Sequence, residues 1–193
     1  MKKESTVLMV MDMQNDILDE NGKAAVFGVG KHARKIKAVE NTKKAIEKAR
    51  KAVVPIVYIQ TFFRHELLPD IGLFRSLKES EAFKKGAHGA EIVGELSPRP
   101  QDYIVEKHSM DAFYNTELED VLKGLGCDTL IFTGVATNLC VETTVRSASD
   151  RGYSIVVLSD CVATISEDAQ NFPINVIFPM LGEVVTVENL ELQ

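Results

Sequence analysis

Apolar residues occur along the chain in short continuous runs of strand length. A strand buried on both faces of a sheet is apolar throughout, so runs of this kind are typical of a parallel sheet covered by helices. The runs that we interpret as strands are Thr6 to Met13, Val53 to Thr61, Tyr103 to Lys107, Asp128 to Gly134, Tyr153 to Asp160 and Glu183 to Val187. Segments of helical character separate most of them. This alternation predicts an α/β fold with three layers, in which helices cover both faces of a mainly parallel six-stranded sheet.

Helical spacing of apolar residues is clearest in Lys31 to Ala52, where many lysines occupy the other positions and are expected to face solvent. A second helix is expected over Asn115 to Leu125 and a third from Cys140 to the Arg151-Gly152 pair. Residues 62–100 differ, because glycine and proline are scattered among polar residues there. We expect an irregular excursion with one short helix around Leu73 to Lys84. Long excursions often form a substrate lid or a subunit contact.

Length and composition narrow the classes of protein that remain. The 193 residues suit one α/β domain, and we take residues 1–193 as that single domain. The formal net charge is −6, and no basic cluster is interleaved with aromatic residues, so nucleic acid is not an expected partner. No apolar stretch reaches the roughly 18 residues of a membrane helix, and the chain starts without a signal-peptide pattern. These features predict a cytoplasmic protein with no membrane partner.

The three cysteines are the first candidates for chemistry. Cys127, Cys140 and Cys161 are odd in number and far apart, and they form no Cys-x-x-Cys pair. Neither a disulfide framework nor a zinc site of usual spacing is therefore implied. Cys140 lies where a buried strand is expected to turn into a helix. Free N–H groups and the positive end of a helix dipole would stabilise a thiolate and an oxyanion there, although free cysteines are often simple core residues.

Two further polar residues close predicted strands: Asp12 ends the first apolar run and Lys107 ends the third. Ligands of open parallel sheets bind outside the carboxyl ends of the strands, so both side chains can converge with Cys140. Alone, an aspartate at a strand end is usually a turn residue, and a lysine is usually solvated. Together, the three supply the base, the cation and the nucleophile of an amide hydrolase.

These residues fall within three ordered motifs. The segments Asp12 to Asp16, Glu106 to Phe113 and Gly134 to Val141 resemble the motifs of the isochorismatase-like cysteine hydrolases, and the resemblance covers nearly the whole chain. It implies a Rossmann-like isochorismatase fold, a catalytic triad of Asp12, Lys107 and Cys140, and a cis peptide bond between Val135 and Ala136. We assign the oxyanion hole to the backbone N–H groups of Ala136 and Cys140. Relatives are commonly dimers or tetramers, so a homodimer or homotetramer is expected.

The resemblance also guides the choice of reaction. Isochorismatases that act on a vinyl ether do not carry the nucleophilic cysteine, so Cys140 favours cleavage of a C–N bond in a small amide or ureide. Residues 137–142 are similar to those of family members that open ureido bonds. Nicotinamidases of the family bind a metal through an Asp-x-His element, which is absent from Gln60 to Glu66. His65 and His88 have no matching spacing, so no metal and no cofactor are expected.

The substrate pocket is harder to place from sequence. The residues that we expect to line it are Gln14, Phe62, Arg64, Phe113, Thr137 and Asn138. Arg64 could pair with a substrate carboxylate through its planar fork or lie on the surface, and Phe62 and Phe113 could instead pack in the core. Two other functions stay open: a nicotinamidase-type amidase, and a non-catalytic thiol or binding protein on the same fold.

Overall fold

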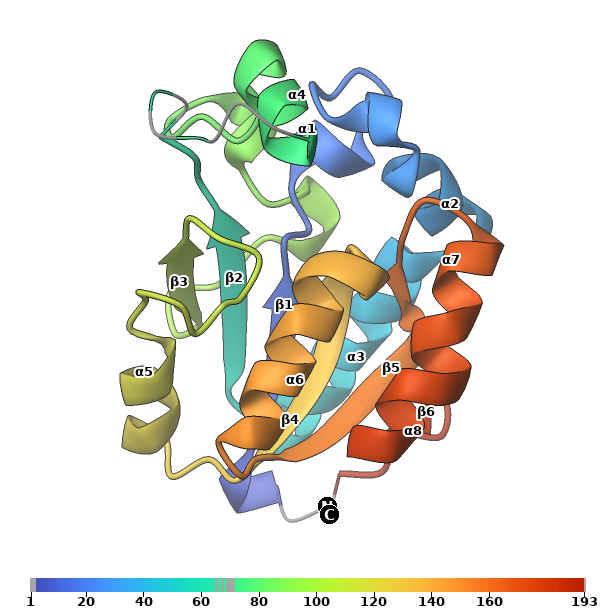
Figure 1. The fold of residues 1–193 in the computed structure, drawn as a ribbon. Coiled ribbons are helices and arrows are strands. Elements are labelled where there is room, and N and C mark those ends of the chain that lie inside the picture. Colours follow the sequence, from blue (N-terminus) through green and yellow to red (C-terminus); the bar gives the residue numbers. More distant parts are fainter. Residues whose placement is uncertain (1–2, 65, 67, 69–71, 193) are drawn as a thin grey trace.

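A computed structural model describes residues 3–64, 66, 68 and 72–192. Within these residues, six strands form one sheet in the order β3-β2-β1-β4-β5-β6, and every pair of neighbours is parallel (Figure 1). The strands are β1 Thr6–Met11, β2 Ile56–Thr61, β3 Tyr103–Lys107, β4 Thr129–Val135, β5 Ser154–Ala163 and β6 Glu183–Val185. The predicted fold class is confirmed.

Helices connect the strands, and short 3-10 and π-helical turns occur between them. The helices are α1 Asn15–Leu18, α2 Val29–Lys35, α3 Ala38–Ala52, α4 Gly72–Ser80, α5 Leu118–Gly124, α6 Glu142–Asp150, α7 Glu167–Phe172 and α8 Phe178–Leu181. The 3-10 turns are Lys3–Ser5, Ala25–Phe27, His88–Ala90 and Gly94–Leu96, and the π-helical turns are Thr137–Val141 and Pro173–Ile177. No helix in the described part of the chain is both long and apolar enough to cross a membrane.

The single helix predicted over Lys31 to Ala52 is wrong, because the chain forms two helices that break at Lys37. Lys37 has a φ of 58°, in the left-handed region, which a helix interior does not allow. The Asn41 side chain donates to the carbonyl oxygens of Ile36 and Asp160, at 3.4 and 3.1 Å. These bonds tie the break to the start of α3 and to β5. The bend was not predicted because apolar spacing continues across it.

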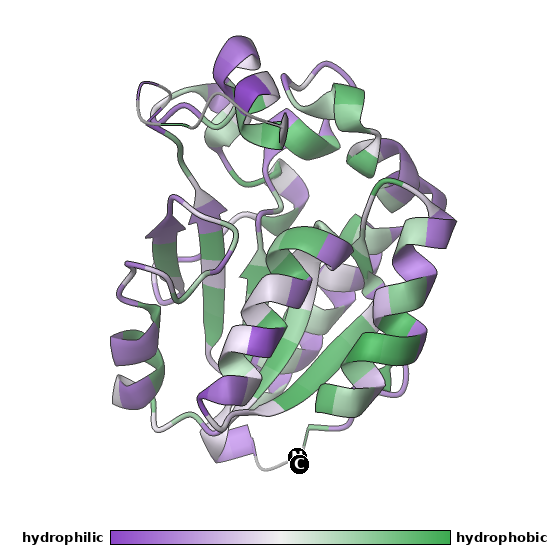
Figure 2. Cartoon of the chain, in the orientation of Figure 1, coloured by the Kyte–Doolittle hydropathy of each residue, from purple (hydrophilic) through white to green (hydrophobic). Residues whose placement is uncertain are grey.

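Two hydrophobic layers flank the sheet. Alternate strand residues point to opposite faces, and α2 and α3 pack on one face, whereas α5, α6 and α8 pack on the other. In Figure 2 the central strands β4 and β5 are coloured mainly as apolar, whereas the helices carry both apolar and polar residues. This packing confirms the predicted three-layer arrangement.

A third, smaller hydrophobic cluster lies beyond the carboxyl ends of the strands. Its buried members are Ala24, Phe63, Leu77, Ala82 and Phe83. They come from the segment after α1 and from the excursion that follows β2, which together cover this edge of the sheet (Figure 1). The space between the edge and the cluster contains the candidate site.

Candidate active site

Three side chains from different strand ends meet at this edge. Asp12 follows β1, Lys107 ends β3, and Cys140 lies in the π-helical turn Thr137–Val141 between β4 and α6. The Lys107 ammonium is 3.1 Å from Asp12 Oδ2 and 3.4 Å from Cys140 Sγ. The structure therefore brings together the acid, the cation and the thiol that the sequence singles out, with the ammonium in contact with the other two.

The Lys107 side chain is fully buried. Its ammonium also donates to the Ser109 carbonyl oxygen at 2.8 Å, in addition to its bond to the Cys140 sulfur and its ion pair with Asp12. Burial by itself lowers the pKa of Lys107, but attraction to Asp12 and Cys140 outweighs burial and leaves the pKa raised. The lysine is a permanent positive charge held between the carboxylate and the sulfur.

Asp12 is held from several sides. Its φ of 53° is strained for a residue with a side chain, and its N–H donates to the Ile59 carbonyl at 2.9 Å. The Thr61 hydroxyl donates to Asp12 Oδ1 at 2.6 Å. Thr61 was missed in the sequence analysis, although it ends the second predicted strand at the same edge of the sheet. Its hydroxyl fixes one carboxylate oxygen, while Lys107 contacts the other.

The pKa of the Cys140 thiol differs from the sequence-based expectation. The lowered pKa expected at a helix start is wrong, because burial raises the pKa of Cys140 to about 11, more than Lys107 lowers it. Near neutral pH the sulfur therefore carries its proton. A thiol in this state becomes a nucleophile only if a neighbouring base accepts that proton.

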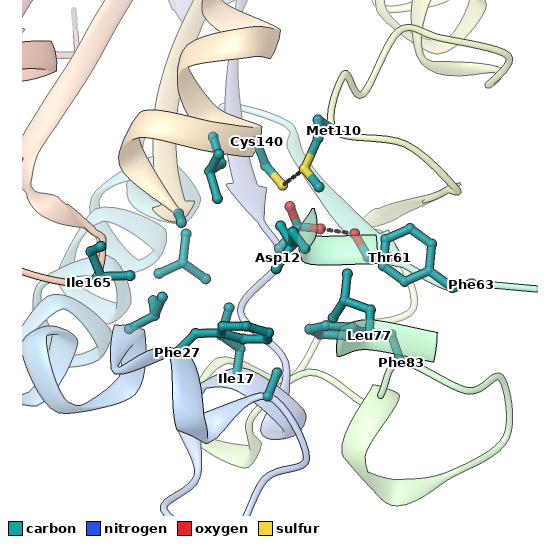
Figure 3. Close-up of a pocket in the computed structure, with 16 residues that line it drawn as sticks. Asp12, Ile17, Phe27, Thr61, Phe63, Leu77, Phe83, Met110, Cys140 and Ile165 are labelled. Carbon is teal, nitrogen blue, oxygen red and sulfur yellow. Dashed lines mark hydrogen bonds between the residues drawn. The ribbon is translucent and has the colours of Figure 1, made fainter. Parts of the chain in front are cut away.

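Met110 is a second residue that the sequence analysis missed. Its sulfur is 3.5 Å from Cys140 Sγ (Figure 3). Met110 lies in the loop after β3, where a lone methionine gives no sequence signal for a site. It covers the thiol with a flexible apolar side chain.

A cavity of about 120 Å³ opens beside the thiol (Figure 3). Its polar side chains among the described residues are Asp12, Thr61 and Cys140, and the rest of the lining is apolar. The apolar lining residues are Ile17, Ala24, Phe27, Val29, Phe63, Leu73, Leu77, Phe83, Met110, Val135, Ala136, Leu139 and Ile165. The peptide bond between Val135 and Ala136, at the cavity wall, is cis.

The structure places several predicted pocket residues outside this lining. The buried Gln14 amide donates to the carbonyl oxygens of Thr61 and Ala90, at 2.9 and 2.7 Å, and accepts from the Thr61 N–H at 2.8 Å. Gln14 therefore fastens the strand end instead of facing a ligand. The Phe113 ring stacks on Tyr153 in the hydrophobic layer under α5 and α6. The core-packing alternative holds for Phe113.

The other predicted pocket residues also have partners elsewhere. Phe62 is buried below the ammonium of Lys85, 5.4 Å from its ring centre. The Thr137 hydroxyl donates to Gln170 Oε1 at 2.6 Å, and Asn138 Oδ1 accepts from the Thr164 hydroxyl at 2.5 Å. Arg64 is exposed in a neighbouring hollow that shares Phe63 and Met110 with the cavity. The walls were mispredicted because most of them come from the segment after β1, from the excursion and from Ile165, whose positions at the sheet edge depend on tertiary packing.

The histidines considered as metal ligands are not gathered at this site. His88 is on the surface, where its ring Nδ1 is 3.1 Å from Glu91 Oε2, and His65 lies outside the described residues. Among the described residues, no three His, Cys, Asp or Glu side chains converge as metal ligands would.

Known proteins resemble this chain over nearly its whole length. The family model described as "Isochorismatase domain" matches residues 6–189. The chain belongs to the isochorismatase family. It is 30% identical over 205 residues to the ureidoacrylate amidohydrolase RutB of Rhizobium rhizogenes, covering 98% of this chain and 83% of the relative.

Solved structures of the family have the same fold. A cysteine hydrolase from Pseudomonas syringae pv. phaseolicola is 28% identical with a TM-score of 0.85, covering 97% of this chain and 91% of that one. N-carbamoylsarcosine amidase from Thermoplasma acidophilum is 28% identical with a TM-score of 0.78, covering 99% of each chain. The sequence-based assignment to the family is confirmed.

Proposed function

We propose that this isochorismatase-family protein is a cysteine hydrolase that cleaves a C–N bond of a small amide or ureide through a thioester on Cys140. The observation that carries the proposal is the position of the Lys107 ammonium, in contact with both the Asp12 carboxylate and the Cys140 sulfur beside a cavity. The reaction class is that of relatives named amidohydrolase and amidase, which act on C–N bonds other than peptide bonds.

In the first half of the reaction, Asp12 accepts the Cys140 proton as the sulfur attacks the substrate carbonyl carbon. The raised thiol pKa makes this base necessary, because little thiolate exists beforehand. Lys107 stabilises the negative charge on carboxylate and sulfur during the transfer. The N–H groups of Ala136 and Cys140, two residues that line the cavity, stabilise the tetrahedral oxyanion.

In the second half, protonated Asp12 returns its proton to the nitrogen, the C–N bond breaks, and ammonia or an amine leaves. Asp12 then accepts a proton from water as the water oxygen attacks the thioester. Collapse of this second intermediate breaks the C–S bond and releases a carboxylic or carbamic acid, and the Cys140 sulfur regains its proton from Asp12. One carboxylate thus serves both steps, and its two oxygens stay oriented by Thr61 and Lys107.

The rival function of a thiol redox sensor is less well supported. Sensor cysteines are exposed and have a low pKa, whereas the Cys140 sulfur is covered by Met110 and the pKa of its thiol is raised. The nicotinamidase alternative is distinguished by metal analysis of the purified protein and by the effect of a chelator on amide hydrolysis.

The decisive test is the Cys140→Ala variant. Ammonia release is measured from nicotinamide, biuret, N-carbamoyl amino acids and ureidoacrylate, and the intact mass of the wild-type protein is recorded during turnover. We expect an acyl adduct on the wild type and a loss of several orders of magnitude in rate for Cys140→Ala. Cys127→Ala is the matched control and keeps the activity. Undiminished hydrolysis by Cys140→Ala contradicts the assignment.

We also infer that residues 1–193 form one domain, which the single described sheet supports, and that the protein assembles as a homodimer or homotetramer. Phe172, Val176 and Met180 are 60%, 43% and 78% exposed, and they follow one another at helical spacing from α7 to α8. An apolar surface of this kind is suited to association with a second copy. A cytoplasmic location stays a prediction.

A further inference from the structure

We propose that the substrate of this site is an uncharged amide with a compact apolar substituent. A ureide that carries a carboxylate or a second amide group does not fit the site. The inference rests on the proposed function, because it assumes that the scissile carbonyl lies at Cys140. It is carried by the chemistry of the cavity lining.

The polar side chains of the cavity belong to the proposed catalytic group or contact it. Asp12 accepts from the Thr61 hydroxyl, and Cys140 contacts the Lys107 ammonium. A ligand can therefore pair one amide group with the thiol, the carboxylate and the adjoining N–H groups. Away from this end, the described lining is aliphatic or aromatic, including Phe27, Phe83 and Leu77 (Figure 3). A second amide placed against those walls would lose its bonds to water without replacement.

A substrate carboxylate finds no partner in the described lining either. The described lining contains no Lys or Arg side chain. Behind it, the Lys107 ammonium already pairs with Asp12 and donates to the Cys140 sulfur and the Ser109 carbonyl. Arg64 lines the neighbouring hollow and not this cavity. A carboxylate would also lie near Asp12, which carries the same charge.

The size of the cavity limits the substituent. Its volume of about 120 Å³ is below the roughly 150 Å³ of an engineered apolar cavity that accepts benzene. Branched groups of three to five carbons therefore fit the space best. The substrate class inferred here differs from that named in the curated relatives, because ureidoacrylate carries both a ureide and a carboxylate.

The test compares pairs of substrates of equal shape. Isovaleramide and biuret differ by replacement of an isobutyl group with a carbamoylamino group, and 4-methylpentanamide and succinamate differ by replacement of an isopropyl group with a carboxylate. We expect kcat/KM for ammonia release to be at least tenfold higher for isovaleramide than for biuret, and at least a hundredfold higher for 4-methylpentanamide than for succinamate. A preference for the polar member of either pair overturns the inference.

A second readout does not depend on hydrolysis. Each compound is tested for protection of Cys140 from iodoacetamide, with alkylation quantified by peptide mass spectrometry. Protection by the apolar members at lower concentration supports the inference, even if no ammonia is released, in which case only the proposed hydrolase function fails. Better protection by biuret or succinamate, or no protection by any compound, overturns the inference itself.

Two substitutions of one cavity-wall residue test whether the lining lacks a cation. Ile165 lines the cavity and is 51% exposed, so a charged side chain can be accommodated there. We expect Ile165→Arg to reduce the discrimination against succinamate about tenfold by supplying the missing cation, whereas Ile165→Leu keeps the wild-type ratio. An unchanged ratio in Ile165→Arg contradicts the claim that the lining lacks a carboxylate partner.

Discussion

At the scale of single residues, the site depends on how burial changes the chemistry of the Cys140 thiol. The pKa of this thiol is raised to about 11, and the largest cause is burial. A raised pKa means that the thiolate fraction near neutral pH is smaller than that of a free cysteine. The reactivity of the thiol in the absence of substrate should therefore be low.

The first prediction concerns the pH dependence of Cys140 alkylation. Because only the thiolate reacts, the rate with iodoacetamide should rise about tenfold per pH unit from pH 7 and level off only near the raised pKa. The measurement is peptide-resolved mass spectrometry over a pH series. The same cysteine in urea-denatured protein is the control, and its rate should level off near pH 8.5, as for a free thiol. A plateau below pH 8 in the folded protein contradicts the role assigned to Asp12.

The second prediction concerns Thr61, which donates to Asp12 Oδ1 at 2.6 Å. Thr61→Val keeps the shape of the side chain but removes the hydroxyl that orients the base. We expect kcat to fall roughly tenfold with little change in KM, since a bond to a charged group is lost and the cavity walls stay in place. Thr61→Ser restores the donor and should retain most of the activity. A change confined to KM would instead place Thr61 in substrate binding.

At the scale of elements, the walls of the cavity are held by a buried carboxylate in the segment after β1. Asp16 Oδ2 accepts from the Phe83 N–H at 2.6 Å and Asp16 Oδ1 accepts from the Lys23 N–H at 3.2 Å. Asp16 is 3% exposed, so both bonds are shielded from water. One residue of α1 thus fixes two segments whose neighbours Ala24 and Phe83 line the cavity.

The third prediction follows from this link. Asp16→Asn has one carbonyl oxygen for two N–H donors, so one donor is left facing an NH₂ group. We expect the free energy of unfolding to fall by about 1–3 kcal/mol and KM for apolar amides to rise several-fold. Urea denaturation and steady-state kinetics measure the two effects. Asp19→Asn, at an exposed position of the same segment, should change either quantity much less. Equal effects of the two variants would contradict the role of Asp16.

The fourth prediction concerns the close approach of β4 to β1. A Cβ at Gly134 would lie 2.1 Å from the Met11 carbonyl oxygen, and its φ of 120° disfavours any side chain. Gly134→Ala should therefore destabilise the fold by about 3 kcal/mol or more and displace Asp12, the residue after Met11. Gly124→Ala at the end of α5, where a Cβ meets nothing within 4 Å, should leave stability equal or slightly higher. Urea denaturation of both variants provides the comparison.

The strands could be predicted from the sequence, whereas the cavity walls could not. The strands were predictable because burial on both faces makes them continuously apolar, and β3 begins and ends where the pattern placed it. The strand ends in turn located Asp12, Lys107 and Cys140. The cavity walls were not predictable, since residues such as Phe83 and Ile165 meet only after distant loops fold onto the sheet edge. The pKa of Cys140 depends on that same covering, and was mispredicted for the same reason.

At the scale of the whole molecule, the C-terminal helical segment from α7 to α8 presents its apolar inner side to the sheet and a second apolar stripe to solvent. Phe178 is fully buried in the hydrophobic layer, whereas Phe172, Val176 and Met180 are exposed. Residues four apart lie on one face of a helix, so the exposed three form a continuous stripe. An exposed stripe on a helix that is also packed underneath is a rigid surface, which lowers the entropy cost of association.

The last prediction therefore concerns assembly. The double variant Phe172→Glu and Met180→Glu places two negative charges on each copy of the stripe, so that two copies would bury like charges against each other. We expect wild-type protein to be a dimer or tetramer by light scattering coupled to size-exclusion chromatography, and the double variant to be smaller. Val26→Glu, at an exposed apolar residue outside the stripe, is the control and should assemble like the wild type. If the wild type is a monomer at micromolar concentration, the stripe has another role. If it is an oligomer that the double variant leaves intact, the copies associate through a different face.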